Sequence, residues 1–192
     1  MPYLIAGLVL FLGLHSIRIV AEGTRSHLRA QWGENAYKGA YTVLSLLGFG
    51  LIVWGFGLAR ETPQVLWAPP TGMRHLAALL TLLAFVFLAA AYVPGNAIKA
   101  RLHHPMVLSV KTWAVAHLLA TGTVAHLLLF GSFLVWAVLC FIASRRRDRA
   151  QGTVYAAGTL PGTVATVVVG VVGWVLFAFY LHGVLIGIRP LS

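Results

Sequence analysis

Residues 122–144 read GTVAHLLLFGSFLVWAVLCFIAS, and RRRDR follows at residues 145–149. An uncharged apolar run of about 20 residues is long enough to cross the hydrocarbon core of a membrane as a helix. A cluster of arginines directly after such a run is typical of the cytoplasmic end of a span, and it is also a candidate site for lipid phosphate or a partner. This stretch therefore predicts a transmembrane helix whose end is marked by positive charge.

Five further apolar runs have a similar character, so the sequence predicts six spans. The expected spans are residues 2–21, 37–59, 72–93, 104–121, 122–144 and 163–188. Gly122 implies a very tight turn between the fourth and fifth spans, and three prolines disfavour a helix at residues 61–71. We expect an all-α fold, a polytopic transmembrane helix bundle that forms a single domain over residues 1–192.

The composition excludes an ordinary soluble domain. Hydrophobic residues make up 59% of the chain, charged residues 9%, and the mean hydropathy is +0.87. A soluble domain carries roughly 25% charged residues, so membrane lipid must cover part of this surface. The net charge of +10 falls mainly in the connections and accompanies no nucleic-acid-binding motif, so no nucleic acid is expected as a partner. The single cysteine, Cys140, excludes an internal disulfide.

Basic residues alternate between the connections, which predicts the orientation in the membrane. Ten follow the first, third and fifth spans: Arg18, Arg25, Arg29, Lys38, Lys99, Arg101, Arg145, Arg146, Arg147 and Arg149. Three lie on the other side: Arg60, Arg74 and Arg189. Short cytoplasmic loops are enriched in lysine and arginine. We therefore expect a multi-pass protein with both termini on the periplasmic side.

Four histidines lie within the apolar runs, whereas all four acidic residues lie in the polar connections. These histidines are His15, His117, His126 and His182. Ionisable groups at membrane depth are costly and indicate function, and neutral imidazole is a common metal ligand. Zinc takes three or four protein ligands, whereas haem needs one or two axial side chains, so a carboxylate-free bundle favours haem. Hydrogen bonding between helices is the alternative role.

Two polar groups of residues carry the candidate site. In the first span His15, Arg18 and Glu22 share one helix face, where His15 is a candidate iron ligand and Arg18 a candidate partner for a haem propionate. Arg18 is alternatively an interface anchor. In the fourth span His104 and Lys111 share a face, and Lys111 lies too deep to reach the interface easily. We expect Lys111 to face an interhelical polar cavity near His104, as a cofactor or substrate anchor or as a structural hydrogen-bond donor.

Three stretches of the chain resemble the NnrU family, and together they cover nearly its whole length. They are HSIR at residues 15–18 with GENAY at 33–37, HPM at 104–106 with WAVAHLLATG at 113–122, and LHGVLIG at 181–187. The family usually has asparagine where this chain has Thr121, and often proline where it has Gly183. The resemblance implies a bacterial inner-membrane protein that supports the nitrite and nitric oxide steps of denitrification.

The related plant 15-cis-zeta-carotene isomerases are membrane haem b enzymes with histidine ligands. By that resemblance His15 and His117 are the expected ligands of haem iron, in a protein with redox or isomerase-like activity. The implied partners are a small apolar, isoprenoid-like substrate or a respiratory protein. The plant enzymes have a cysteine where this chain has Ala114. Helix rise places His15 and His117 at depths that differ by roughly 10 Å, so His104 is an alternative ligand. A non-enzymatic scaffold and a carrier of a small lipid or isoprenoid are the alternative functions.

Overall fold

The computed structural model of this chain describes residues 1–191, and its regular structure is helical. The helices are α1 (Pro2–Val20), α2 (Glu22–Trp32), α3 (Glu34–Glu61), α4 (Met73–Tyr92), α5 (Ala97–Leu102), α6 (Pro105–Ala120), α7 (Val124–Gln151) and α8 (Leu160–Leu176). A π-helical turn, η1 (Phe177–Leu181), continues α8 into the short α9 (His182–Ile186). Within residues 1–191 no β-strand forms, so the predicted all-α class is confirmed.

Five helical segments are long and apolar enough to cross a membrane: α1, α3, α4, α7 and the continuous segment Leu160–Ile186. The remaining apolar helix, α6, has 16 residues. At a rise of about 1.5 Å per residue it reaches about 24 Å, less than the roughly 30 Å hydrocarbon core. The helices occupy the six predicted positions. α7 runs beyond the predicted end at residue 144, so the arginine run is helical.

The connection after the first span also forms a helix, which corrects one expectation. The backbone turns at Ala21, with φ −142° and ψ 48°, and Glu22 begins α2 instead of continuing α1. The expected common face of His15, Arg18 and Glu22 is therefore wrong. Glu22 instead accepts a hydrogen bond from Arg25 on its own helix, at 2.7 Å between Oε1 and Nη1.

Glycines let the backbones of α1 and α3 touch. A Cβ on Gly55 would lie 2.3 Å from the Leu4 nitrogen, and a Cβ on Gly7 would lie 2.6 Å from the Ile52 nitrogen. In a lipid bilayer the hydrophobic effect does not drive helices together. Small residues instead let two helix backbones approach closely and pack. Leu4 is fully buried at this contact, in a core that also includes side chains of α6 and α7.

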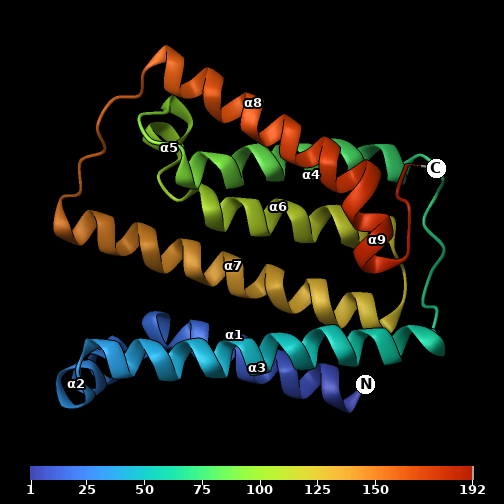
Figure 1. Ribbon diagram of the computed structural model, residues 1–192, viewed down its shortest axis with the longest axis horizontal. Coiled ribbons are helices and arrows are strands. Elements are labelled where there is room, and N and C mark those ends of the chain that lie inside the picture. The colour runs from blue at the N-terminus through green and yellow to red at the C-terminus, as the bar shows by residue number, and fades with distance from the viewer. Residues whose placement is uncertain (192) are drawn as a thin grey trace.

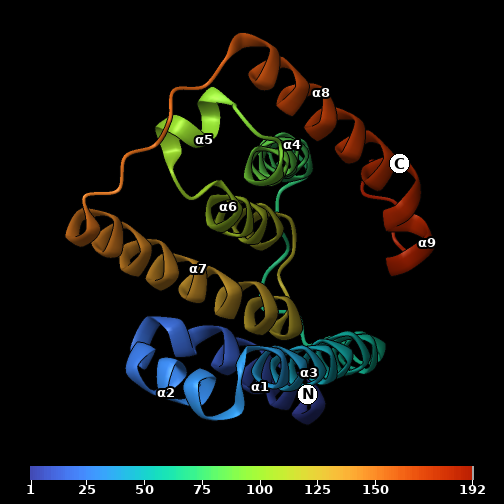
Figure 2. The same ribbon diagram turned by 60° about the vertical axis from the view of Figure 1, so that its left-hand side comes forward.

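α7 lies between two groups of helices. Figure 2 shows α1, α2 and α3 on one side of α7, and α4, α5, α6 and α8 on the other. α8 joins α4 at a second close contact, where a Cβ on Gly170 would lie 2.6 Å from the Val86 Cα. The Trp174 indole donates a hydrogen bond to Thr81 Oγ1 at 3.0 Å in the same interface. Most other large side chains of α8 are exposed, as expected of a lipid-facing helix.

The bundle has two distinct ends (Figure 1). We call one the basic end: it holds α2, α5, the C-terminal ends of α1 and α7 and the ten basic residues named above. The other, the terminal end, holds both chain ends, α9, the turn between α6 and α7 and the remaining three arginines. The charge alternation in the sequence therefore becomes a separation in space.

The turn at the terminal end is as tight as predicted. α6 ends at Ala120 and α7 begins at Val124. The Gly122 carbonyl accepts hydrogen bonds from the nitrogens of Leu66 and Trp67, at 2.7 and 3.2 Å. Even a methyl group on Gly122 would overlap the Trp67 carbonyl, because its Cβ would lie 2.0 Å from that oxygen. Gly122 thus fastens the non-helical loop of residues 62–72 onto the bundle.

Gly55→Ala is expected to lower the thermal unfolding midpoint of the detergent-purified protein. The new Cβ would overlap the Leu4 backbone and push α1 from α3, at a cost of about 1–3 kcal/mol. Gly57→Ala is the matched control, because no other segment lies within 4 Å and alanine favours a helix by up to about 1 kcal/mol. Equal losses in both variants would contradict a specific α1–α3 contact at Gly55.

Candidate functional site

His117 lies near the end of α6, at the terminal end of the bundle. Its Nδ1 is 2.9 Å from the Trp113 carbonyl oxygen, which can only accept, so Nδ1 carries the proton. Nε2 is then unprotonated, the state in which histidine binds a metal while its other nitrogen is held in place. The imidazole stacks on Phe130 with centroids 4.4 Å apart and an interplanar angle of 23°. The ring is therefore fixed in both tautomer and orientation.

Two further histidines join His117 from other helices. His126, in the first turn of α7, stacks on the same Phe130 ring at 5.9 Å. His182, the first residue of α9, donates from Nδ1 to the Ile188 carbonyl at 2.6 Å, so it has the same tautomer as His117. His117 on α6, His126 on α7 and His182 on α9 thus lie at the same end of the bundle (Figure 1). We call these three residues the terminal histidine cluster.

Aromatic rings and one arginine surround the terminal histidine cluster. Phe56 of α3 meets His126 edge-on at 5.1 Å, and Phe177 meets His182 edge-on at 5.8 Å. The Arg60 guanidinium lies 5.9 Å from the centre of the Phe56 ring and donates to the Ile186 carbonyl at 2.9 Å. Phe177 begins the π-helical turn that leads into His182, and such turns are frequent at functional sites. The cluster thus combines imidazole rings, apolar walls and a cation.

His15 resembles His117 locally but lies elsewhere. Its Nδ1 lies 2.7 Å from the Phe11 carbonyl oxygen, which can only accept, so Nδ1 is the donor. The ring stacks on Phe11 at 4.2 Å and also meets Tyr41 at 5.4 Å and Trp136 at 6.2 Å. Each of the two predicted ligands therefore has a nitrogen available for coordination.

The structure does not bring His15 and His117 together. The ring contacts that connect them run through Phe11, Phe133 and Trp113 in turn. On α7, the residue beside His15 is Trp136 and the residue beside His117 is Phe130, six positions or about 9 Å apart along the axis. Two histidines that bind the same haem iron lie on opposite faces of one porphyrin ring. In this arrangement His15 and His117 do not fit as such a pair.

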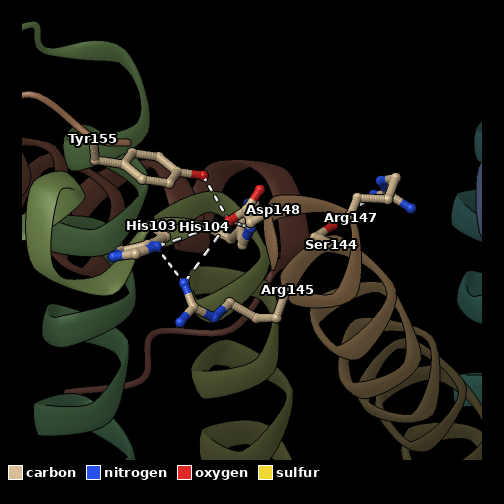
Figure 3. A network of polar contacts seen from close by, with 7 residues as sticks. All are labelled: His103, His104, Ser144, Arg145, Arg147, Asp148 and Tyr155. Carbon is tan, nitrogen blue, oxygen red and sulfur yellow. Dashed lines mark hydrogen bonds and ion pairs between the residues drawn. The ribbon is translucent and has the colours of Figure 1, made fainter. Parts of the chain in front are cut away.

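His104 and its neighbours form a polar network at the basic end (Figure 3). His104 Nε2 lies 2.8 Å from Asp148 Oδ2, and the same oxygen accepts a hydrogen bond from Tyr155 at 3.0 Å. Arg145 lies 3.8 Å from this carboxylate and also contacts His103 Nδ1. Burial raises the pKa of the Tyr155 phenol, and the hydrogen bond to Asp148 raises it further, so the phenol stays a donor. Asp148 engages Nε2 of His104, so only Nδ1 of that histidine is left to bind a metal.

The network ties three segments together, which the sequence did not predict. His103 and His104 precede α6, Asp148 lies in the last turns of α7, and Tyr155 follows α7. His103 holds a left-handed backbone conformation, φ +69°, that is uncommon for a residue other than glycine. The signal in the sequence was Asp148 itself, a single acid among four arginines. We interpreted that run as an orientation signal or a lipid site, and so missed its link to the histidines.

Lys111 has a different environment from the one predicted. Its Nζ lies 5.4 Å from the centre of the Phe141 ring on α7. Within residues 1–191 this ammonium group makes no hydrogen bond or ion pair, so the polar contacts expected near His104 are missing. A cation–π contact, which stabilises a desolvated cation by up to about 2 kcal/mol, takes their place.

Asp148→Asn is expected to lower the unfolding midpoint, because His104, Tyr155 and Arg145 all lose a charged partner. Hydrogen bonds to charged groups contribute about 1.5–3 kcal/mol, and the Asp148 side chain is only 14% exposed, so we expect a loss of about 2 kcal/mol. Glu61→Gln is the control, since Glu61 is exposed and has no ion pair within the described residues. If both variants unfold at the wild-type temperature, the network does not hold the basic end together.

Comparison with known proteins agrees with the motifs in the chain. Residues 3–190 match the family described as NnrU protein, which is nearly the whole sequence. Neither the curated proteins nor the solved structures contain a match. The matched region includes all helices of the bundle and the whole terminal histidine cluster. The chain therefore belongs to the NnrU family.

Proposed function

We propose that this protein binds haem b at the terminal histidine cluster and supports nitrite and nitric oxide respiration by a redox or isomerase-like activity. One observation carries the proposal. His117 and His182 come from different helices at the same end of the bundle, and each donates its Nδ1 proton to a backbone carbonyl. In its neutral form each therefore has an unprotonated Nε2, the atom through which histidine binds haem iron.

The surrounding residues fit the other parts of a haem. Phe130, Phe177 and Trp113 supply flat apolar walls of the kind that line cofactor sites. Arg60 supplies a planar cation suited to a carboxylate such as a propionate. If bound here, haem would supply one-electron chemistry or a Lewis-acidic iron. The stacking contact with Phe130 orients His117.

His15 and Arg18 have no part in this haem site, because they lie at the basic end. His126 is the alternative iron ligand at this site, since its ring stacks on the same Phe130 ring as His117. Exposed apolar side chains next to His182, among them Phe179, Val184 and Leu185, would let an isoprenoid-like substrate or a respiratory partner approach from lipid. The charge separation supports an inner-membrane orientation in which the basic end is cytoplasmic.

Protein purified in detergent from haem-replete cells is expected to show a Soret band near one haem per chain. His117→Ala and His182→Ala should each remove the band or change its position, because each removes a nitrogen that would bind the iron. His75→Ala is the matched control. His75 lies in the first turn of α4, at the terminal end of the bundle, and is exposed. His15→Ala should leave the spectrum unchanged.

The same spectra separate the alternatives. If His15→Ala loses the Soret band and His182→Ala keeps it, the haem ligands are instead His15 and His117, the pair that the family resemblance implies. A colourless and stable wild-type protein would overturn haem binding. The histidines would then be structural, as in a scaffold or a carrier of a small lipid.

Reporter fusions test the orientation independently of haem. A reporter joined after residue 192 is expected to be active on the periplasmic side, and one joined after Arg149 on the cytoplasmic side. The physical reason is the retention of short arginine-rich segments in the cytoplasm. The reversed pattern, or the same side for both fusions, would contradict the proposed orientation.

A further inference from the structure

A second polar site lies at the basic end, where α1, α2 and α3 line an open cavity of about 420 Å³. Its walls include three cations, one from each helix: Arg18, Arg25 and Lys38. We propose that this cavity binds the phosphate of an anionic amphiphile, a phospholipid headgroup whose acyl chains lie along α3. The cavity is distinct from the terminal histidine cluster, so this proposal stands independently of haem.

The charges around the cavity leave an unneutralised excess. Arg25 pairs with Glu22 at 2.7 Å, and Lys38 pairs with Glu34 at 2.6 Å. Neither glutamate lines the cavity. The guanidinium of Arg18 makes no hydrogen bond or ion pair within residues 1–191. An unpaired arginine that shares a cavity wall with two other cations is suited to a phosphate, because its planar fork matches two phosphate oxygens.

Hydroxyl groups complete the polar wall. Tyr41 and Thr42 of α3 line the cavity next to the cations, and each hydroxyl is a potential donor to an anion. His15 also lies in the wall, where its ring stacks on Phe11. Charged and hydroxyl donors thus converge from three helices. Cations that only set the orientation of the protein need to be on the cytoplasmic side, but they need not line one cavity.

The apolar surroundings indicate a lipid rather than a soluble phosphate ester. Leu14 and Ile17 form part of the same cavity wall. Beyond Thr42, α3 exposes Val43, Leu46 and Leu47 by 57%, 64% and 56%. These side chains belong to a helix that is long enough to span a membrane, so acyl chains can cover them. A soluble ester would gain nothing from this apolar face.

Delipidated protein in detergent provides the test, with dioctanoyl phosphatidylglycerol as the probe and the unfolding temperature as the readout. We expect saturable stabilisation by this lipid. Arg18→Gln should raise the half-saturating concentration about tenfold, because it removes a charge-assisted contact. Arg146→Gln is the matched control: it removes the same charge from an exposed position at the same end, outside the cavity, and should bind like the wild type.

A second variant and two further ligands make the outcome decisive. Thr42→Val removes a wall hydroxyl and should also weaken binding, although less than Arg18→Gln. Dioctanoyl phosphatidylcholine, which has no net charge, should stabilise less than phosphatidylglycerol. Glycerol 1-phosphate distinguishes the source: equal potency would assign the phosphate site to a soluble ester. Equal effects of Arg18→Gln and Arg146→Gln would overturn the site, because binding would then reflect surface charge alone.

Discussion

The cost of placing charge in hydrocarbon governs this structure. A lysine or arginine at membrane depth is costly, whereas a neutral imidazole with its Nδ1 bonded to a carbonyl needs no counterion. Thirteen of the fourteen cations therefore lie towards the two ends of the bundle, while His15 and His117 lie inside helices. Lys111 is the exception, and the ring of Phe141 lies beside its ammonium group. The same constraint produces both candidate sites, one neutral and one cationic.

α7 joins these two sites into one molecule. Phe130 on α7 stacks with His117 at the terminal end, and Trp136 meets His15 nearer the basic end. Phe133 lies between them and contacts both Phe11 and Trp113. A continuous series of aromatic contacts therefore connects α1 to α6 across α7. Farther along α7, Asp148 engages His104 and Tyr155, so one helix orders the interior and the basic end.

Much of the fold could be predicted because hydropathy and breakers are local properties. Six apolar runs, the tight turn at Gly122 and the non-helical residues 62–72 follow from chain composition and sterics. The prediction did not extend to α2, whose polar residues carry no apolar signal, or to the break at Ala21. That single break removed Glu22 from the face of His15 and Arg18. A break in a helix at one or two residues is enough to change which side chains share a predicted site.

The sequence by itself determined the fold class, the family, the separation of charge and the histidines that carry the candidate chemistry. Each of these depends on residue type and spacing along one segment, so no distant contact was needed. The tertiary structure decided which histidines lie together. Helix packing brought His117 and His126 to the same Phe130 ring, with His182 at the same end of the bundle. It also placed His15 beside a basic cavity and turned His104 towards Asp148. Those choices depend on backbone contacts such as Gly55 against Leu4 and on a π-helical turn before His182, which spacing in the chain does not encode.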